Sequence, residues 1–396
     1  MEWFDLDFAS SPYRMAAGEK DCVLTQQMNI LTDYHRAHCP AYDRMLSACG
    51  ILHEAKHYSE LPYLPVGLFK RLTLESVSGR DFLRGETQAA SLKHAAGSKE
   101  NGEADPAKGA GSALGDSIPG VKTVTSSGTS GQQTSQIILD GETRAAQQQA
   151  LAAIVGDFLG KKRIPMLVID CPATVKKRDH FSARTTGILG FTLFGTHRTF
   201  ALRDDLSLDV KAVRAFLDQY GGQPFFVFGF TFLVWKYFCL ELERQDIAMD
   251  FSNGILIHGG GWKKLAAEAV SEKEFQKRIQ VVCGLTDIHD YYGMAEQTGS
   301  IFMECECGHL HASDYSGILV RRAKDFSLCE VGEPGIIQVL SVLPKSYPGH
   351  SLLTEDEGVL LGVDDCPCGR KGAYFKVYGR LKNAEIRGCS DIFSGS

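Results

Sequence analysis

The sequence has no excess of basic residues and no long apolar run. Its 42 Lys and Arg against 48 Asp and Glu give a net charge of −6 and a pI near 6.1, so it lacks the basic surface that neutralises a nucleic-acid backbone. No segment approaches the ~20 consecutive apolar residues of a membrane helix, and the start of the chain has no basic region leading into an apolar one, as a signal peptide does. We therefore expect a cytoplasmic protein with no nucleic-acid partner and no membrane span.

A disulfide framework is also not expected, although the chain has 12 cysteines. In a cytoplasmic chain of 396 residues, cysteines are more often thiols, metal ligands or nucleophiles. The length suits one large domain or about two to three ordinary ones. An apolar content of 44% supports a substantial core. The function must therefore be sought in local motifs.

The most informative motif is a run of hydroxyl residues and glycines, Thr-Ser-Ser-Gly-Thr-Ser-Gly, at residues 125–131. It has neither the lysine of a Walker loop nor the glycine spacing of a Rossmann turn. Glycines let the backbone approach an anion, and the hydroxyls donate hydrogen bonds to phosphate oxygens. A polar linker is the alternative, but residues 136–139 return at once to a strand-like apolar pattern. We predict that nucleotide phosphates bind to Thr125, Ser126, Ser127, Gly128, Thr129, Ser130 and Gly131.

Alternating strand and helix patterns predict an α/β fold. Strand-like segments at 165–170, 225–230 and 255–262 alternate with helical patterns at about 208–220 and 263–280. The last of these strands ends in three glycines, and the carboxyl ends of strands are where open α/β sheets bind ligands.

Composition divides the chain into five segments. Residues from about 85 to 120 are rich in Ala, Gly, Ser, Lys and Glu, and short strands and turns dominate after residue 300. The predicted segments are an N-terminal part of the large α/β domain at 1–85, a flexible low-complexity insertion at 86–119, an α/β core for nucleotide and acyl group at 120–300, a β-rich subdomain with a zinc site at 301–378, and a hinge stub at 379–396.

A second motif, Tyr-Tyr-Gly-Met-Ala-Glu, combines two aromatic rings, a glycine and a carboxylate at residues 291–296. These groups suit an adenine ring and a Mg²⁺ ion, although a packed tyrosine and a surface glutamate would also explain the motif. Asp356 and Arg380 are later charged residues beside turn glycines, and each in isolation would be a solvated surface charge. The order of the motifs along the chain supplies the specificity that each lacks alone.

In order and approximate spacing, these motifs resemble the core motifs of the adenylate-forming synthetase superfamily. Within that superfamily, residues 259–264, 296–302, 346–350 and 387–391 resemble the acyl-protein synthetase family of bacterial luminescence operons. The resemblance covers roughly residues 120–392. It implies the superfamily's large α/β domain with a smaller β-rich subdomain and a truncated C-terminal domain. It also implies that ATP and a fatty acid form an acyl-adenylate and pyrophosphate before a thiol accepts the acyl group.

The resemblance assigns a role to each motif. The hydroxyl loop would hold the β- and γ-phosphates. Gly260, together with Tyr291 or Tyr292, would bracket the adenine ring. Glu296 would ligate Mg²⁺, and Asp356 would bind the ribose hydroxyls.

Arg380 matches the superfamily's hinge-adjacent arginine, which implies that it contacts the ribose or α-phosphate and offsets the charge that develops as the carboxylate attacks phosphorus. Two features depart from the superfamily. Ala295 stands where many relatives have a threonine that reaches the α-phosphate, and Thr298 is a weak candidate to replace it. The sequence ends at Ser396, so the mobile C-terminal domain with its catalytic lysine is expected to be missing or reduced to a stub, which puts the usual domain rotation in doubt.

Cys389 lies in that stub, between Gly388 and Ser390 and two residues after Arg387. Such a neighbourhood can lower a thiol pKa, although a tail cysteine is usually inert. The segment resembles the one that carries the family's acyl-accepting cysteine. This implies an acyl-thioester on Cys389 that passes to a partner reductase, with Glu296 and Arg380 as the other catalytic residues.

Cysteines and histidines form a further constellation, with a Cys-Glu-Cys-Gly-His-Leu-His segment at 305–311 and a Cys-Pro-Cys segment at 366–368. Two close pairs of soft ligands suit tetrahedral Zn²⁺, and unpaired thiols are the alternative. The phenylacetate-coenzyme A ligase branch has similar residues, and a zinc with four protein ligands would be structural. That similarity implies the ligands Cys305, His311, Cys366 and Cys368, with Cys307 and His309 as spares.

Three functions remain open. The first is an ATP-dependent fatty acyl-protein synthetase that supplies a fatty acid reductase. The second is an acyl- or aryl-coenzyme A ligase of the phenylacetate type, with a different thiol acceptor. The third is a non-catalytic scaffold that keeps the nucleotide fold. The aromatic segment 225–235 is a candidate lining of an acyl pocket, although a plain core strand explains most of its side chains.

Overall fold

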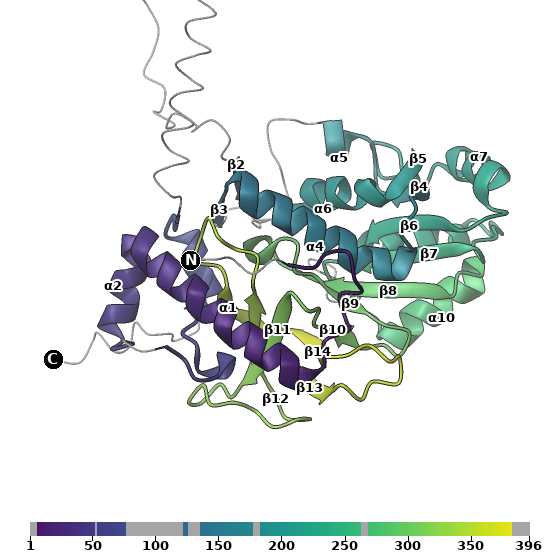
Figure 1. The fold of residues 1–396 in the computed structure, drawn as a ribbon. Coiled ribbons are helices and arrows are strands. Elements are labelled where there is room, and N and C mark those ends of the chain that lie inside the picture. The colour runs from purple at the N-terminus through teal and green to yellow at the C-terminus, as the bar shows by residue number, and fades with distance from the viewer. Residues whose placement is uncertain are drawn as a thin grey trace, which may run out of the picture.

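The computed structural model describes residues 6–51, 54–76, 122–125, 135–176, 183–262 and 268–381. Within them, one sheet runs through the molecule in the strand order β11-β12-β13-β14-β10-β9-β8-β7-β6-β4-β5, with β1 beside β13. A separate antiparallel hairpin joins β2 (Lys122–Thr125) to β3 (Gln136–Leu139). Helices pack on the large sheet (Figure 1).

One half of the sheet is parallel, as the alternating pattern predicted. Its strands are β4 (Ile164–Ile169), β5 (Gly195–Phe200), β6 (Phe225–Phe230), β7 (Gly254–Gly259) and β8 (Asp287–Tyr292). Every residue of β6 is buried, which is typical of a central parallel strand covered on both faces.

Helices precede or connect these strands, and polar residues cap several of the helices. The helices are α4 (Gly141–Leu159), α5 (Ala173–Lys176), α6 (Ala183–Phe191), α7 (Val210–Tyr220), α8 (Thr231–Leu233), α9 (Leu240–Arg244) and α10 (Glu272–Cys283). The Asp140 carboxylate caps α4 by accepting a hydrogen bond from the Thr143 backbone N–H at 2.7 Å.

The helix predicted at 263–280 begins later than expected. Its first residue is Glu272, because the Ser271 hydroxyl accepts a hydrogen bond from the Glu274 backbone N–H at 3.2 Å and so caps the helix there. Gly284, with φ of 73°, ends it. Residues 268–271 are not α-helical, and 263–267 lie outside the described residues.

The other half of the sheet is antiparallel. Its strands are β9 (Phe302–Glu304), β10 (Leu310–His311), β11 (Ser316–Arg321), β12 (Pro334–Ser341), β13 (Ser351–Val363) and β14 (Ala373–Arg380). Strand β8 pairs with β9 through Tyr291–Met303 and Tyr292–Phe302, which joins the two halves. The domain boundaries that composition suggested remain a prediction.

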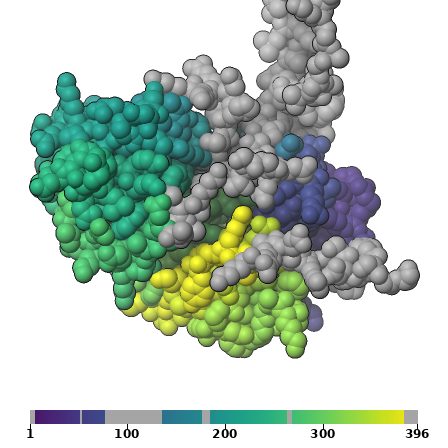
Figure 2. Space-filling view, turned by 180° about the vertical axis from the view of Figure 1, so that it is seen from behind, coloured from purple at the N-terminus to yellow at the C-terminus, as the bar shows by residue number. Residues whose placement is uncertain are grey.

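The N-terminal segment packs on the antiparallel half. It contains α1 (Ala17–His38), α2 (Pro40–Ala48) and β1 (Leu64–Pro65), which pairs in parallel with β13. Tyr42 and Phe69 from this segment share a core with Phe302 and Tyr347. Figure 2 shows the yellow C-terminal strands between the purple N-terminal segment and the teal and green parallel half.

Two buried histidines hold α1 against the loop before β13. The rings of His35 and His350 stack with centroids 4.9 Å apart. His35 Nδ1 lies 2.8 Å from the Ser76 hydroxyl, and His350 Nε2 lies 3.0 Å from the Thr32 hydroxyl. Burial lowers the pKa of both rings, that of His350 to about 3, so both are neutral at pH 7.

The insertion predicted at 86–119 and residues 382–396 of the predicted stub lie outside the described residues. None of the described helices is both long enough and apolar enough to cross a membrane.

Candidate active site

The glycines that end β7 lie directly beside β8. Gly259 pairs with Tyr291 in register, and an ideal Cβ at Gly259 would lie 2.5 Å from Tyr291 Cε1 and 2.8 Å from the Tyr291 carbonyl oxygen. Only glycine leaves room for the ring at this position. The next residue, Gly260, has φ of 81°, which glycine adopts without strain. The two predicted adenine-binding residues Gly260 and Tyr291 therefore lie at the ends of neighbouring strands.

Aromatic rings support Tyr291 from the other side. Its ring centroid lies 5.1 Å from that of Phe191 on α6, and Phe191 stacks on Phe228 of β6 at 4.3 Å. On the same helix, an ideal Cβ at Gly187 would lie 3.1 Å from Phe230 Cζ and 3.8 Å from the Tyr291 hydroxyl. Helix α6 thus packs closely on the carboxyl ends of β6 and β8.

Asp290 is a member of this region that the sequence analysis missed. Its carboxylate accepts a hydrogen bond from the Tyr291 backbone N–H at 2.8 Å and lies 3.5 Å from His258 Nδ1 on β7. The Thr231 hydroxyl lies 3.0 Å from the same nitrogen. Although 42% of the Asp290 side chain is exposed, surrounding protein desolvates the carboxyl group and raises its pKa to about 7. The sequence feature that could have identified Asp290 was its position just before Tyr291, near the end of a predicted strand.

Tyr292 points away from Tyr291, because successive side chains of a strand alternate between faces. Its hydroxyl donates a hydrogen bond to Asp356 Oδ2 at 2.6 Å. Asp356 on β13 is in register with Arg380 on β14. The Arg380 guanidinium is 68% exposed and lies 3.4 Å from Glu355 Oε2. The structure therefore brings Tyr292, Asp356 and Arg380 together.

Glu296 lies on the short 3₁₀ helix Ala295–Gln297 and is 6% exposed. Its backbone oxygen accepts a hydrogen bond from the Tyr347 hydroxyl at 2.9 Å, and the neighbouring Gln297 amide donates to the Gly349 carbonyl at 2.8 Å. These contacts fix the backbone beside the carboxylate. The Thr298 hydroxyl donates to the Ala295 carbonyl at 3.0 Å, so it is engaged locally.

The predicted phosphate loop follows β2. Thr125 is the last residue of that strand and pairs with Gln136 of β3. Strand β3 leads directly into α4 through the cap residue Asp140. The remaining loop residues lie outside the described part of the chain, as does Cys389; these are Ser126, Ser127, Gly128, Thr129, Ser130 and Gly131.

The four predicted zinc ligands come together. The ligand atoms of Cys305, His311, Cys366 and Cys368 all lie within 4.8 Å of one another. The sulfurs of Cys305 and Cys366 are 3.9 Å apart, and the Cys368 sulfur lies 3.4 Å from His311 Nε2. Zn–S and Zn–N bonds of about 2.3 and 2.0 Å in a tetrahedron require edges of about 3.8 and 3.5 Å. These two edges of the cluster are therefore close to those of a tetrahedral zinc site.

Two similar turns supply these ligands. Each has the sequence Cys-x-Cys-Gly, and the glycines Gly308 and Gly369 have φ of 75° and 84°. In each turn the glycine N–H donates to the carbonyl of the first cysteine, at 2.9 Å to Cys305 and 3.0 Å to Cys366. We call them the first knuckle, residues 305–308, and the second knuckle, residues 366–369.

The spare residues lie at the edge of the cluster. Cys307 is exposed, and its backbone N–H donates to the Cys305 sulfur at 3.4 Å. His309 Nδ1 lies 3.3 Å from the Cys366 sulfur, and its ring stacks on Tyr374 at 4.9 Å. His309 is therefore a neighbour of the cluster and not one of its four convergent ligands.

The fold is that of the adenylate-forming ligases. An open conformation of 2-hydroxyisobutyryl-CoA ligase, in complex with 2-HIB-AMP and CoA, matches with a TM-score of 0.63 and 16% identity over 97% of this chain and 76% of its own. The postadenylation state of the same enzyme, in complex with 2-HIB-AMP, gives 0.62 at 16% identity over 96% and 73%. At this identity the likeness establishes the fold alone, which confirms the fold class predicted from the motifs.

The family follows from a different comparison. A family model described as acyl-protein synthetase, LuxE, matches residues 115–396. The chain therefore belongs to the acyl-protein synthetase family, as its motifs indicated, and is an ATP-dependent enzyme that forms acyl-adenylates. A search among curated proteins found no match.

Proposed function

We propose that this protein activates a fatty acid with ATP, as an acyl-adenylate, and then transfers the acyl group to the thiol of Cys389. The observation that carries this proposal is the family match over residues 115–396, which includes the hydroxyl loop, the strand ends and Cys389. A partner reductase would then receive the acyl group from the thioester. We expect this sequence of steps to take place in the cytoplasm.

The strand ends would bind the nucleoside. Adenine would lie between Gly260 and the Tyr291 ring, since Tyr292 points to the other face of β8. Asp290, as a carboxylate, would accept a hydrogen bond from the adenine amino group. Asp356 would bind the ribose hydroxyls, and its present partner, the Tyr292 hydroxyl at 2.6 Å, would fix its orientation.

The phosphates would bind to the hydroxyl loop after β2, at residues 125–131. Its neutral donors would hold the β- and γ-phosphates, and Arg380 would supply positive charge at the α-phosphate. Glu296 would hold the Mg²⁺ that accompanies ATP, because its backbone is fixed and its carboxylate forms no hydrogen bond or ion pair with another of the described residues. The ion would neutralise phosphate charge.

Two displacements then complete the reaction. A carboxylate oxygen of the fatty acid attacks the α-phosphorus, an O–P bond forms, and the bond to the β-phosphate breaks to release pyrophosphate. The Cys389 thiolate attacks the carbonyl carbon of the adenylate, a C–S bond forms, and AMP leaves. The thiol proton must leave before the second step, and the guanidinium of Arg387 would favour the thiolate.

We further propose that the cluster of Cys305, His311, Cys366 and Cys368 holds a structural Zn²⁺. The donor set is three sulfurs and one imidazole nitrogen, which leaves no open position on a four-coordinate ion. The agreement of the 3.9 and 3.4 Å edges with tetrahedral geometry supports the assignment. The metal would join the two knuckles and take no part in the chemistry.

A coenzyme A ligase is the second candidate. The observation in its favour is the likeness to a ligase whose structure contains CoA, although that likeness concerns the fold. The two candidates share the first step and differ in the thiol acceptor. Membership of the acyl-protein synthetase family argues against a non-catalytic scaffold.

Pyrophosphate exchange tests the adenylation step separately from transfer of the acyl group to a thiol. Exchange of labelled pyrophosphate into ATP, dependent on added fatty acid, is expected for the wild type and for Cys389→Ser, because the thiol acts only after adenylation. Rapid release of acyl-CoA on addition of CoA, without acylated protein, would favour the second candidate. No exchange with any carboxylic acid would contradict adenylation itself.

A further inference from the structure

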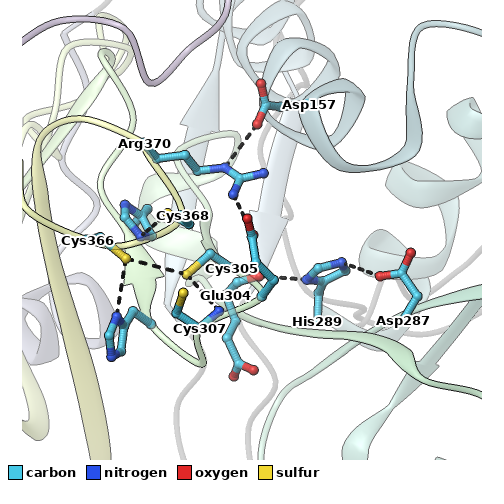
Figure 3. A network of polar contacts seen from close by, with 12 residues as sticks. Asp157, Asp287, His289, Glu304, Cys305, Cys307, Cys366, Cys368 and Arg370 are labelled. Carbon is cyan, nitrogen blue, oxygen red and sulfur yellow. Dashed lines mark hydrogen bonds and ion pairs between the residues drawn. The ribbon is translucent and has the colours of Figure 1, made fainter.

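Arg370 follows the second knuckle and contacts three separate segments of the chain. Its Nε donates to Asp157 Oδ2 on α4 at 3.0 Å, and a terminal nitrogen donates to Glu306 Oε2 in the first knuckle at 2.8 Å. It also lies over the ring of Tyr13, in the N-terminal segment. Figure 3 shows the guanidinium between Asp157 and the sulfur cluster. Its side chain is only 16% exposed.

Aromatic rings enclose the guanidinium. Its central carbon lies 4.3 Å from the ring centroid of Phe158 and 5.7 Å from that of Tyr13. The Tyr13 ring in turn lies 6.1 Å from the His311 ring, edge to face. Such stacking fixes the plane of the guanidinium. An arginine in a surface ion pair keeps far more freedom and contributes little to stability.

Charge explains why a cation is required at this position. Three thiolates and one Zn²⁺ carry a net charge of −1, and the cluster is largely buried. An isolated buried charge is costly unless a partner offsets it. Arg370 lies two residues after Cys368 and supplies a positive charge at the edge of the cluster, where Asp157 and Glu306 hold its guanidinium in place.

The corresponding position in the first knuckle is different. His309 follows Cys-x-Cys-Gly there, as Arg370 does in the second knuckle. His309 stacks on Tyr374 and reaches only the edge of the cluster. The two turns are thus alike in backbone, and only the second is followed by a side chain that is always positively charged.

We propose that Arg370 is a positioning residue of the metal centre: its positive charge offsets the net negative charge of the cluster, and its ion pairs fasten both knuckles to α4. This inference rests on the zinc site proposed above. It also gives the centre a link to the nucleotide region. Helix α4 has 19 residues, which is about 28 Å at 1.5 Å per residue, and its other end adjoins the hairpin that carries the phosphate loop.

Zinc release measures the inference directly. Protein loaded with one equivalent of Zn²⁺ is mixed with an excess of 4-(2-pyridylazo)resorcinol, and formation of the coloured zinc complex gives the rate. We expect Arg370→Met to release zinc about 10- to 100-fold faster than the wild type, the range typical of losing an outer partner of a metal ligand. Arg370→Lys keeps the charge and loses the planar fork, so its rate should fall between the two.

Two further variants isolate the effect. Asp157→Asn leaves the positive charge of Arg370 and weakens its attachment to α4, so the zinc-release rate should rise less than that of Arg370→Met. Arg198→Met is the matched control, because Arg198 is an exposed arginine on β5, far along the sheet from the cluster. Its release rate should equal that of the wild type.

The absorption spectrum of the cobalt-substituted protein is a second measurement, and it would not change if Arg370 only stabilised the fold. Loss of the nearby positive charge raises the energy of the sulfur electrons, so the sulfur-to-cobalt charge-transfer band should shift to longer wavelength in Arg370→Met. The band should stay in place in Arg198→Met. If Arg370→Met does not fold by circular dichroism, the rates and spectra of Arg370→Lys and Asp157→Asn decide.

Two results would overturn the inference, and they differ. A folded Arg370→Met with the wild-type release rate and an unshifted cobalt band would refute the role of Arg370 while leaving the zinc site intact. A wild-type protein that takes up no zinc would refute the metal site itself, and the inference with it. Neither result would affect the pyrophosphate exchange that tests adenylation.

Discussion

Gly259 is a position where one added carbon would disturb the proposed nucleotide site directly. An alanine Cβ would lie 2.5 Å from Tyr291 Cε1, whereas ordinary contact begins at 3.4 Å. The ring or the strand would therefore have to move by about 3.4 − 2.5 = 0.9 Å. The ring cannot swing away freely, because Phe191 lies behind it at 5.1 Å. The Tyr291 carbonyl, at 2.8 Å from the same Cβ, also obstructs the new methyl group.

Overpacking of this kind costs about 1–3 kcal/mol. In a chain of 396 residues, each kcal/mol corresponds to about 1.2 °C in melting temperature, so Gly259→Ala should melt about 1–4 °C lower. Displacement of the Tyr291 ring should also raise the KM for ATP, since that ring is proposed to cover adenine. The melting temperature is measured by circular dichroism and KM by fatty acid-dependent pyrophosphate exchange.

Gly156→Ala is the matched control for this prediction. Gly156 lies inside α4 with nothing within 4 Å of an added Cβ, so alanine should stabilise the helix by up to about 1 kcal/mol. The same chemical change should thus have opposite effects at the two glycines. Wild-type stability together with a wild-type KM in Gly259→Ala would refute the account of the strand ends.

Three further predictions concern other residues. ATP affinity should fall as the pH drops through about 7, because the pKa of Asp290 is raised to about 7 and its carboxyl group is protonated below that value. Pyrophosphate exchange measured as a function of pH checks this. The variant Asp290→Asn should show a flatter pH profile. The free energy of unfolding should fall below pH 6.5. In that range an unfolded histidine gains a proton, whereas His350 in the folded protein does not, because its pKa is lowered to about 3. The unfolding free energy should change by up to about 1.4 kcal/mol per pH unit for each such histidine. Thermal melts over a series of pH values should show a smaller change in His350→Gln. Gly187→Leu tests residues 225–235 as the lining of the acyl pocket, because its side chain would press on Phe230, 3.1 Å from an added Cβ. It should favour shorter acids in a panel of fatty acids, and an unchanged preference would place the acyl pocket elsewhere.

The parallel half of the fold was predictable because its strands are short, apolar and separated by one clear helical pattern. Segments at 165–170 and 225–230 correspond to β4 and β6, and the pattern ending at 220 corresponds to α7. The antiparallel half was foreseen only as short strands. Its pairing depends on contacts between residues distant in sequence, such as Leu64 with Leu352, which periodicity does not reveal.

The site was predictable where residue type and spacing carry the chemistry. Close pairs of soft ligands indicated a metal-binding constellation, and the resemblance to the phenylacetate-coenzyme A ligase branch selected the four residues whose ligand atoms the structure brings together. Asp290 and Arg370 were missed because an isolated acid or arginine is normally a surface charge. Only the fold places Asp290 beside His258 on the neighbouring strand, and Arg370 between Asp157 and the first knuckle.

The most direct test of the central claim is the intact mass of the protein after incubation with ATP, Mg²⁺ and a panel of fatty acids. The account predicts a wild-type mass increase equal to the acid minus one water, which disappears on treatment with hydroxylamine. The increase should be absent in Cys389→Ser and present in the matched control Cys22→Ser, since Cys22 is an exposed cysteine on α1. An acyl adduct that persists in Cys389→Ser, or a wild type that makes AMP without any adduct, would contradict it.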